Sequence, residues 1–181
     1  MQGCHPDLAA PCASLDYTMN LTILPNRVLL DGNDLLKLRE SARFLACFGN
    51  PSRRRDIPMH LSGTRVAMVW DNLGLVAYED RPELTMSHLY LAFDPNDTPE
   101  RPKQACNSII EINGGTVTAE TLEGKLPRDG STPIIADSGK RFFHETESYS
   151  VHFNFERQPN PDGRYPITGR LVSVSFSWRQ H

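Results

Sequence analysis

Apolar and polar residues alternate along much of this 181-residue chain, with the period of two that is typical of β-strands. The clearest runs lie at 86–94, 151–156 and 172–179. In the first, Leu89 and Leu91 point to one side and Tyr90 to the other. Such alternation gives one buried face and one face toward water, so it predicts an antiparallel sheet.

Two more strands are expected at 65–71 and 73–80, joined by a tight turn at 72–74. One face of the first strand is large and apolar, and carries Val66, Met68 and Trp70. The other face carries Ala67 and Val69, which are small enough for a helix to lie on. The rest of the chain is expected to add strands to this hairpin.

A helix is predicted over 39–48, with Ala42, Leu45 and Ala46 on one side and Phe44 and Phe48 adjacent to it. Gly49 follows where a left-handed residue ends a helix, and Pro51 prevents continuation.

Turn residues divide the remaining segments. Pro25 and Asn26 separate two short strands within 21–30, and Asn113-Gly114 predicts a hairpin within 108–118. Residues 121–143 contain several Gly and Pro residues and are expected to be irregular.

The length suits one domain. We therefore predict an α+β fold, in which an antiparallel sheet of about six to eight strands carries a helix on one face. Residues 1–18 lack either structural period and are expected to be a flexible leader that is dispensable for folding, so that 19–181 form the domain.

Composition narrows the class of protein. A net charge of −3 argues against a nucleic-acid-binding protein, which normally has a basic excess. There is no apolar run long enough to span a bilayer, and no signal peptide at the start, so a cytoplasmic protein without membrane contact is expected. The four cysteines have no CxxC spacing and are expected to be reduced.

Recognisable reaction chemistry is missing from the sequence. His152, Asn154 and Glu156 share a strand face, but they offer too few good zinc ligands. Cys106 has no motif that supplies a base, and the basic run 53–55 is expected to be a solvated loop or a contact with an acidic partner. We therefore predict no catalytic residue, no metal site and no cofactor.

Acidic residues follow two neighbouring strands. The first group is Glu79, Asp80 and Glu83, and the second is Asp94 and Asp97. Because the two strands are adjacent, the groups are expected to share an edge of the sheet. They are the candidate partner-binding residues, and a basic protein such as a nuclease would be attracted to them.

The segments 48–53, 69–78, 149–155 and 171–178 resemble those of an uncharacterised family of small bacterial α+β domains. The resemblance spans about residues 20–179 and implies a layout similar to β-lactamase-inhibitor proteins. Similar families often serve as immunity proteins, encoded beside antibacterial toxins of contact-dependent, polymorphic or type VI secretion systems. No catalytic residues come with the family.

The resemblance therefore implies a non-enzymatic immunity protein that occludes the active site of a cognate toxin or effector. A structural or accessory binding module of a secretion or envelope system is the alternative. An enzyme would instead require polar side chains that converge in a deep pocket. The oligomeric state is left open by the sequence.

Overall fold

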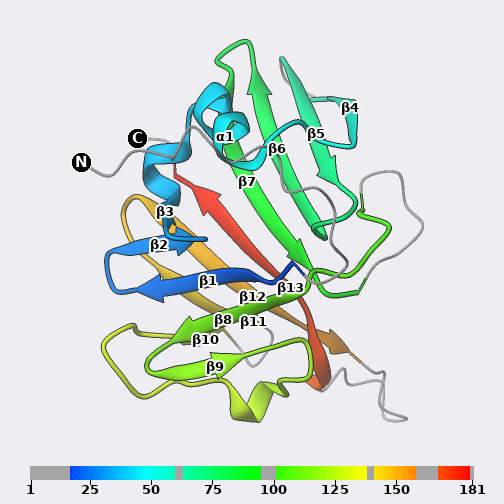
Figure 1. Cartoon of the computed structure of the whole chain (residues 1–181). Helices are drawn as coiled ribbons and strands as arrows, with labels where there is room; N and C mark the ends of the chain where they lie inside the picture. Colours follow the sequence, from blue (N-terminus) through cyan, green and yellow to red (C-terminus); the bar gives the residue numbers. More distant parts are fainter. Residues whose placement is uncertain (1–16, 60–62, 95–100, 138–140, 158–166, 180–181) are drawn as a thin grey trace.

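Two β-sheets pack face to face in the computed structural model, which describes residues 17–59, 63–94, 101–137, 141–157 and 167–179 (Figure 1). The larger sheet has eight strands and the smaller has five. In Figure 1 the five-stranded sheet and the helix α1 lie in front of the eight-stranded sheet. The predicted single sheet with a helix on it is therefore only part of the fold, which is mostly sheet.

The eight-stranded sheet is antiparallel throughout, as predicted. In spatial order its strands are β10 (Ile135–Asp137), β11 (Arg141–Glu145), β12 (Tyr149–Arg157), β13 (Ile167–Trp178), β7 (Thr85–Ala92), β6 (Leu75–Arg81), β5 (Thr64–Trp70) and β4 (Arg53–Pro58). Two expectations were wrong. The region 121–143 contains β10 and part of β11, and the arginine run 53–55 belongs to an edge strand rather than a loop. An edge strand pairs on one side only, so it tolerates charges that a central strand does not.

The five-stranded sheet brings the start of the chain beside its middle. Its strands, in spatial order, are β3 (Asn33–Asp34), β2 (Arg27–Leu30), β1 (Met19–Leu24), β8 (Ser108–Ile112) and β9 (Gly115–Val117). Strands β1 and β8 are parallel, which the expectation of a purely antiparallel fold missed. The predicted turns at Pro25-Asn26 and Asn113-Gly114 are confirmed. Both residues of the second turn have positive φ, as a type I′ hairpin requires.

The helical segments are short: α1 (Ser41–Phe48), and the 3₁₀ turns η1 (Leu35–Leu38) and η2 (Glu123–Lys125). Gly49 ends α1 with a φ of +72°, as predicted. The buried residues of α1 are Ser41, Phe44 and Phe48, so the predicted buried side at Ala42 and Ala46 was wrong. None of the helices in the described ranges has the length and apolar character needed to cross a membrane.

Helix α1 lies on the large apolar face of β5 rather than on its small one. The rings of Phe44 and Trp70 are 5.7 Å apart, and Trp70 Nε1 donates to the Gly49 carbonyl at 3.3 Å. Packing the helix on Trp70 removes more apolar area from water than packing it on Ala67 and Val69 would, so the helix lies on the Trp70 face of β5. Ala67 and Val69 therefore point to the opposite, outward side of the sheet.

The core lies between the two sheets. Inward side chains of β1, β2 and β8 meet those of β7, β12 and β13, and all of them are nearly inaccessible to water. Trp178 closes one end of this core, since its indole donates a 2.9 Å hydrogen bond to the Leu35 carbonyl of η1.

Contacts with the fold begin before Met19 in the described residues. Tyr17 donates its hydroxyl to Asp31 at 2.5 Å, and Asn107 donates to the Thr18 hydroxyl at 3.1 Å. Tyr17 and Thr18 are therefore attached to the fold rather than part of a leader. Residues 1–16, the rest of the expected leader, lie outside the described residues.

Gly74 sits where two segments approach closely, and its replacement tests this packing. Its φ is +64°, and a Cβ would lie 2.2 Å from the Cys106 nitrogen. Gly32 has a similar φ of +77° but open space around it. We expect Gly74→Ala to cost clearly more than the roughly 1–3 kcal/mol of backbone strain alone, and Gly32→Ala to stay within that range. Equal losses in urea unfolding would contradict the close approach.

Candidate functional site

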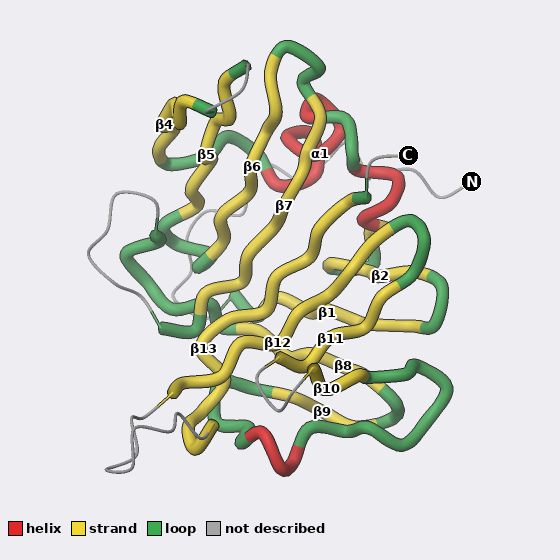
Figure 2. Tube along the Cα trace, turned by 180° about the vertical axis from the view of Figure 1, so that it is seen from behind, coloured by secondary structure: helices red, strands yellow, loops and turns green. Residues whose placement is uncertain are grey.

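The outward face of the eight-stranded sheet is the most distinctive surface of the molecule. Seen from behind, no other described element lies over its central strands (Figure 2). Five ring-bearing side chains project from this face, which we call the aromatic face: Tyr78, His88, Tyr90, Phe143 and His152. They come from β6, β7, β11 and β12, and each is partly exposed.

The rings support one another in two groups. Tyr78 lies with its ring 5.6 Å from that of Tyr90 and 6.4 Å from that of His88, both edge-on. Phe143 and His152 stack at 5.6 Å on the other side of β13. Because neighbouring rings restrict one another, little side-chain freedom remains to be lost when a partner binds.

Serine side chains fill the space between the two groups. Ser175 lies in register between Tyr90 and His152, and only 7% of it is exposed although no described strand covers this face. Asn154 donates to the Ser173 hydroxyl at 3.1 Å, and the His152 ring is 3.2 Å from the Ser150 hydroxyl. The result is a surface of rings with hydroxyl groups packed among them.

Arg65 and Asp80 form an ion pair at the border of the aromatic face, so their charges neutralise each other. Arg65 donates to Asp80 at 2.6 Å, and the Ser87 hydroxyl donates to the same carboxylate at 3.2 Å. Burial, followed by the charge of Arg65, holds the pKa of His88 below its ordinary value of 6.5. The Nδ1 atom of His88 is buried and has no hydrogen-bond partner among the described residues, which also disfavours the charged ring.

This arrangement predicts a dependence of stability on pH. With its pKa lowered in the folded state, His88 takes up a proton more readily in the unfolded chain, so stability is lost as pH falls below about 6.5. Urea unfolding at pH 7.5 and 5.5 should show a smaller loss for His88→Gln than for the unchanged protein. Equal losses would mean that His88 titrates normally. The aromatic, titratable and charged groups around His88 that can affect its protonation are Tyr78, Tyr90, Arg65, Asp80 and His152.

The acidic candidates of the first group do not form one surface. Glu79 is 4% exposed, points to the core side of β6 and pairs with Arg81 at 3.1 Å. Asp80 points outward and is held by Arg65. Glu83 alone is exposed, in the turn between β6 and β7.

The second acidic group lies elsewhere. Asp94 is exposed just beyond the far end of β7, and Asp97 lies outside the described residues. Strands β6 and β7 are antiparallel, so the end of β6 and the end of β7 are at opposite ends of the sheet. The expectation of a shared acidic edge was therefore wrong.

Two of the four cysteines, Cys47 and Cys106, lie in the described residues. Cys106 is 5% exposed, and burial raises the pKa of its thiol to about 12, so it stays protonated at neutral pH. Cys47 is half-buried, with its sulfur 3.9 Å from the Asn33 side-chain oxygen. Within the described residues, no three His, Cys, Asp or Glu side chains lie close enough to hold a metal ion.

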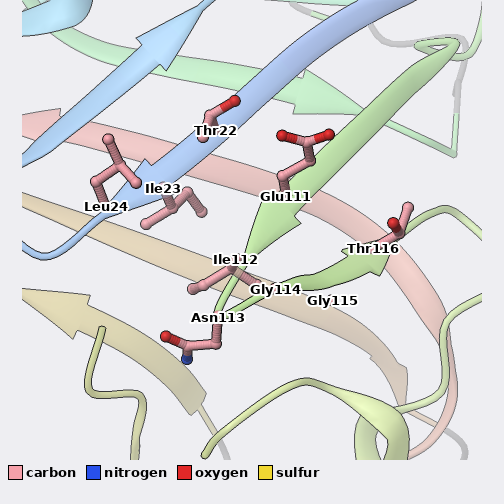
Figure 3. Close-up of a pocket in the computed structure, with 9 residues that line it drawn as sticks. All are labelled: Thr22, Ile23, Leu24, Glu111, Ile112, Asn113, Gly114, Gly115 and Thr116. Carbon is pink, nitrogen blue, oxygen red and sulfur yellow. The ribbon is translucent and has the colours of Figure 1, made fainter. Parts of the chain in front are cut away.

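A hollow of about 350 Å³ opens on the five-stranded sheet, where the parallel strands β1 and β8 end (Figure 3). Thr22, Glu111 and Thr116 lie in one row across it, because both threonines are in register with Glu111. Among the described residues that line this hollow, Glu111 is the sole ionisable side chain. General acid–base catalysis commonly pairs two such groups, and the described lining supplies one of them.

The aromatic face was missed as a site although the alternation placed His88, Tyr90 and His152 on the polar faces of their strands, while Phe143 fell in the region expected to be irregular. His88 and Tyr90 lie opposite Leu89 and Leu91 in the predicted strand, and the structure confirms this. The sequence signal for a site was the presence of Tyr and His on a strand face that was expected to be exposed to water. It becomes persuasive only when β11 and β12 bring Phe143 and His152 alongside.

The fold and the site define a small, mostly β protein that offers an open sheet face. The chain belongs to the family described as domain of unknown function DUF7738, whose model matches residues 20–126. No curated protein and no solved structure matches the chain. The matched part includes β1 to β9, and so Tyr78, His88 and Tyr90, while Phe143 and His152 lie beyond it.

Proposed function

We propose that this protein is a non-enzymatic binding protein, and specifically an immunity protein that neutralises a cognate antibacterial toxin by covering its active site. The observation that carries the proposal is the aromatic face. Tyrosine and histidine rings there stand on a hydrogen-bonded sheet whose central strands no described element covers. Tyr gives large contact area at low cost in conformational entropy, and aromatic residues are enriched at protein interfaces.

Binding by a sheet face suits inhibition. An inhibitor needs a surface that keeps its shape while the partner's cleft closes on it, and the central strands β6, β7, β13 and β12 are each paired on both sides. Inhibition by occlusion also asks for no reactive group on this chain. The type of partner comes from the resemblance to immunity families, and the proposal places the protein in the cytoplasm, away from membranes and nucleic acid.

The residues proposed for the contact differ from those expected from the sequence. Glu79 and Asp80 are each engaged by an arginine of the same chain, so they offer little charge to a partner. The contact is therefore assigned to the aromatic face, and Glu83 and Asp94 are left at the periphery, where exposed charges mainly affect the rate of association.

Co-expression tests this function. The product of the neighbouring gene should be toxic when produced alone and harmless when this protein is present, and the two should purify as a stable complex. A complex with a secretion component that is not toxic would favour the alternative, an accessory module of a secretion or envelope system. Turnover of a substrate by this chain alone would overturn both.

A further inference from the structure

The edge strand β4 is a second place where the molecule can receive a partner. It contributes six residues to the end of the eight-stranded sheet and pairs only with β5 among the described strands. The other terminal strands are shorter: β3 has two residues, and β9 and β10 have three each. An unpaired strand edge presents backbone donors and acceptors to which another strand can add.

Arginines give this edge a distinct charge. Arg54 and Arg55 are consecutive and exposed, so their side chains leave opposite faces of the strand. Arg53 is matched by Asp71, to which it donates two hydrogen bonds at 2.9 and 2.7 Å. Lys103 is exposed beside the same carboxylate, to which its backbone N–H donates at 2.9 Å. Asp56 is the one carboxylate within β4.

The charge decides between possible occupants of the edge. A second copy paired antiparallel about the centre of β4 would set Arg54 against Ile57 and Arg55 against Asp56, which leaves the charge of Arg54 without a carboxylate opposite it. An acidic strand would instead place carboxylates against Arg54 and Arg55. Ile57 is half-buried and Met59 is 42% exposed, so apolar contact is available where the strand ends.

We propose that β4 accepts an extended acidic segment of the partner protein, which adds a ninth strand to the eight-stranded sheet. This inference rests on the proposed binding function and names a second element of the partner. Backbone hydrogen bonds would supply affinity, and the arginines would select acidic over basic segments. Because β4 and the aromatic face belong to the same sheet, one partner can reach both.

A short peptide tests this pairing without knowledge of the partner. The probe is an acetylated and amidated six-residue peptide of alternating Glu and Val, and the readout is the backbone amide shifts of the whole protein. We expect shifts centred on β4 and β5, with an affinity that falls as salt rises. The same peptide with Lys for Glu, or with N-methylated alternate residues, should bind at least tenfold more weakly.

Variants complete the test. Arg54→Glu combined with Arg55→Glu should reduce peptide binding at least tenfold, whereas Lys37→Glu, an exposed change on η1, should not alter it. Shifts confined to other edges, no shifts at millimolar peptide, or undiminished binding after N-methylation would overturn the proposal. A failure of toxin neutralisation with intact peptide pairing would instead reject the proposed function alone.

Discussion

Alanine in place of Trp178 or Phe153 should lower the free energy of unfolding by about 3–5 kcal/mol, the largest stability effects expected in this chain. Phe153 is 1% exposed and lies in the core between the sheets. Trp178 is 6% exposed, packs edge-on against Phe176 at 4.7 Å and donates to η1. Each truncation leaves a cavity, and at Trp178 the Leu35 carbonyl also loses its donor.

Urea unfolding measures these losses, and Ser177→Ala is the matched control. Ser177 precedes Trp178 on β13, points to the outward face and is half-buried, so its replacement should cost at most about 0.5 kcal/mol. If Ser177→Ala cost as much as the core truncations, the two faces of β13 would be assigned wrongly.

Removal of the Tyr90 or Tyr78 ring should have the largest effect on function. If the aromatic face is the contact surface, alanine at either position should weaken toxin binding by about 2 kcal/mol or more, which is roughly 30-fold. The loss should appear mainly as faster dissociation, since neutral rings contribute little to long-range attraction. Association and dissociation rates measured with the purified toxin immobilised on a sensor surface would give the change in the dissociation rate.

The control for these variants lies on the other sheet. Thr116→Ala changes an exposed residue of β9 in the hollow on the five-stranded sheet, and it should leave toxin binding unchanged. Melting temperatures of all three variants must stay near that of the unchanged protein for the comparison to hold. Full affinity in Tyr78→Ala and Tyr90→Ala would remove the aromatic face from the contact.

Local signals predicted the parts of the fold that depend on local chemistry. The alternation in β7, β12 and β13 gave both strand type and face, because one side of each is buried. Asn113-Gly114 gave a hairpin because few other pairs accept positive φ at both positions.

Features that depend on distant partners were not predictable in the same way. The parallel pairing of β1 with β8 joins residues about 90 positions apart, and nothing within either strand encodes it. The charged run of β4 looks like a loop until β5 is placed beside it. The buried side of α1 is the side that packs on Trp70. The sequence of the helix alone does not show which face of β5 it packs against.

The candidate site shows the same division. Sequence reasoning gave weight to carboxylates at strand ends, but their roles depend on neighbours such as Arg65 and Arg81. It placed His88 and Tyr90 on a wet face without recognising a site, since the other half of that face comes from strands that follow some 50 residues later.

A stoichiometric titration tests the central claim, that this protein acts by binding alone. The activity of the neighbouring gene product should fall linearly as the protein is added and reach its minimum at one molecule of inhibitor per molecule of toxin. The recovered toxin should be chemically unchanged and regain activity when the complex is dissociated. Complete inactivation at well below one equivalent, with a permanently altered toxin, would show turnover and contradict the account, as would undiminished activity at excess protein.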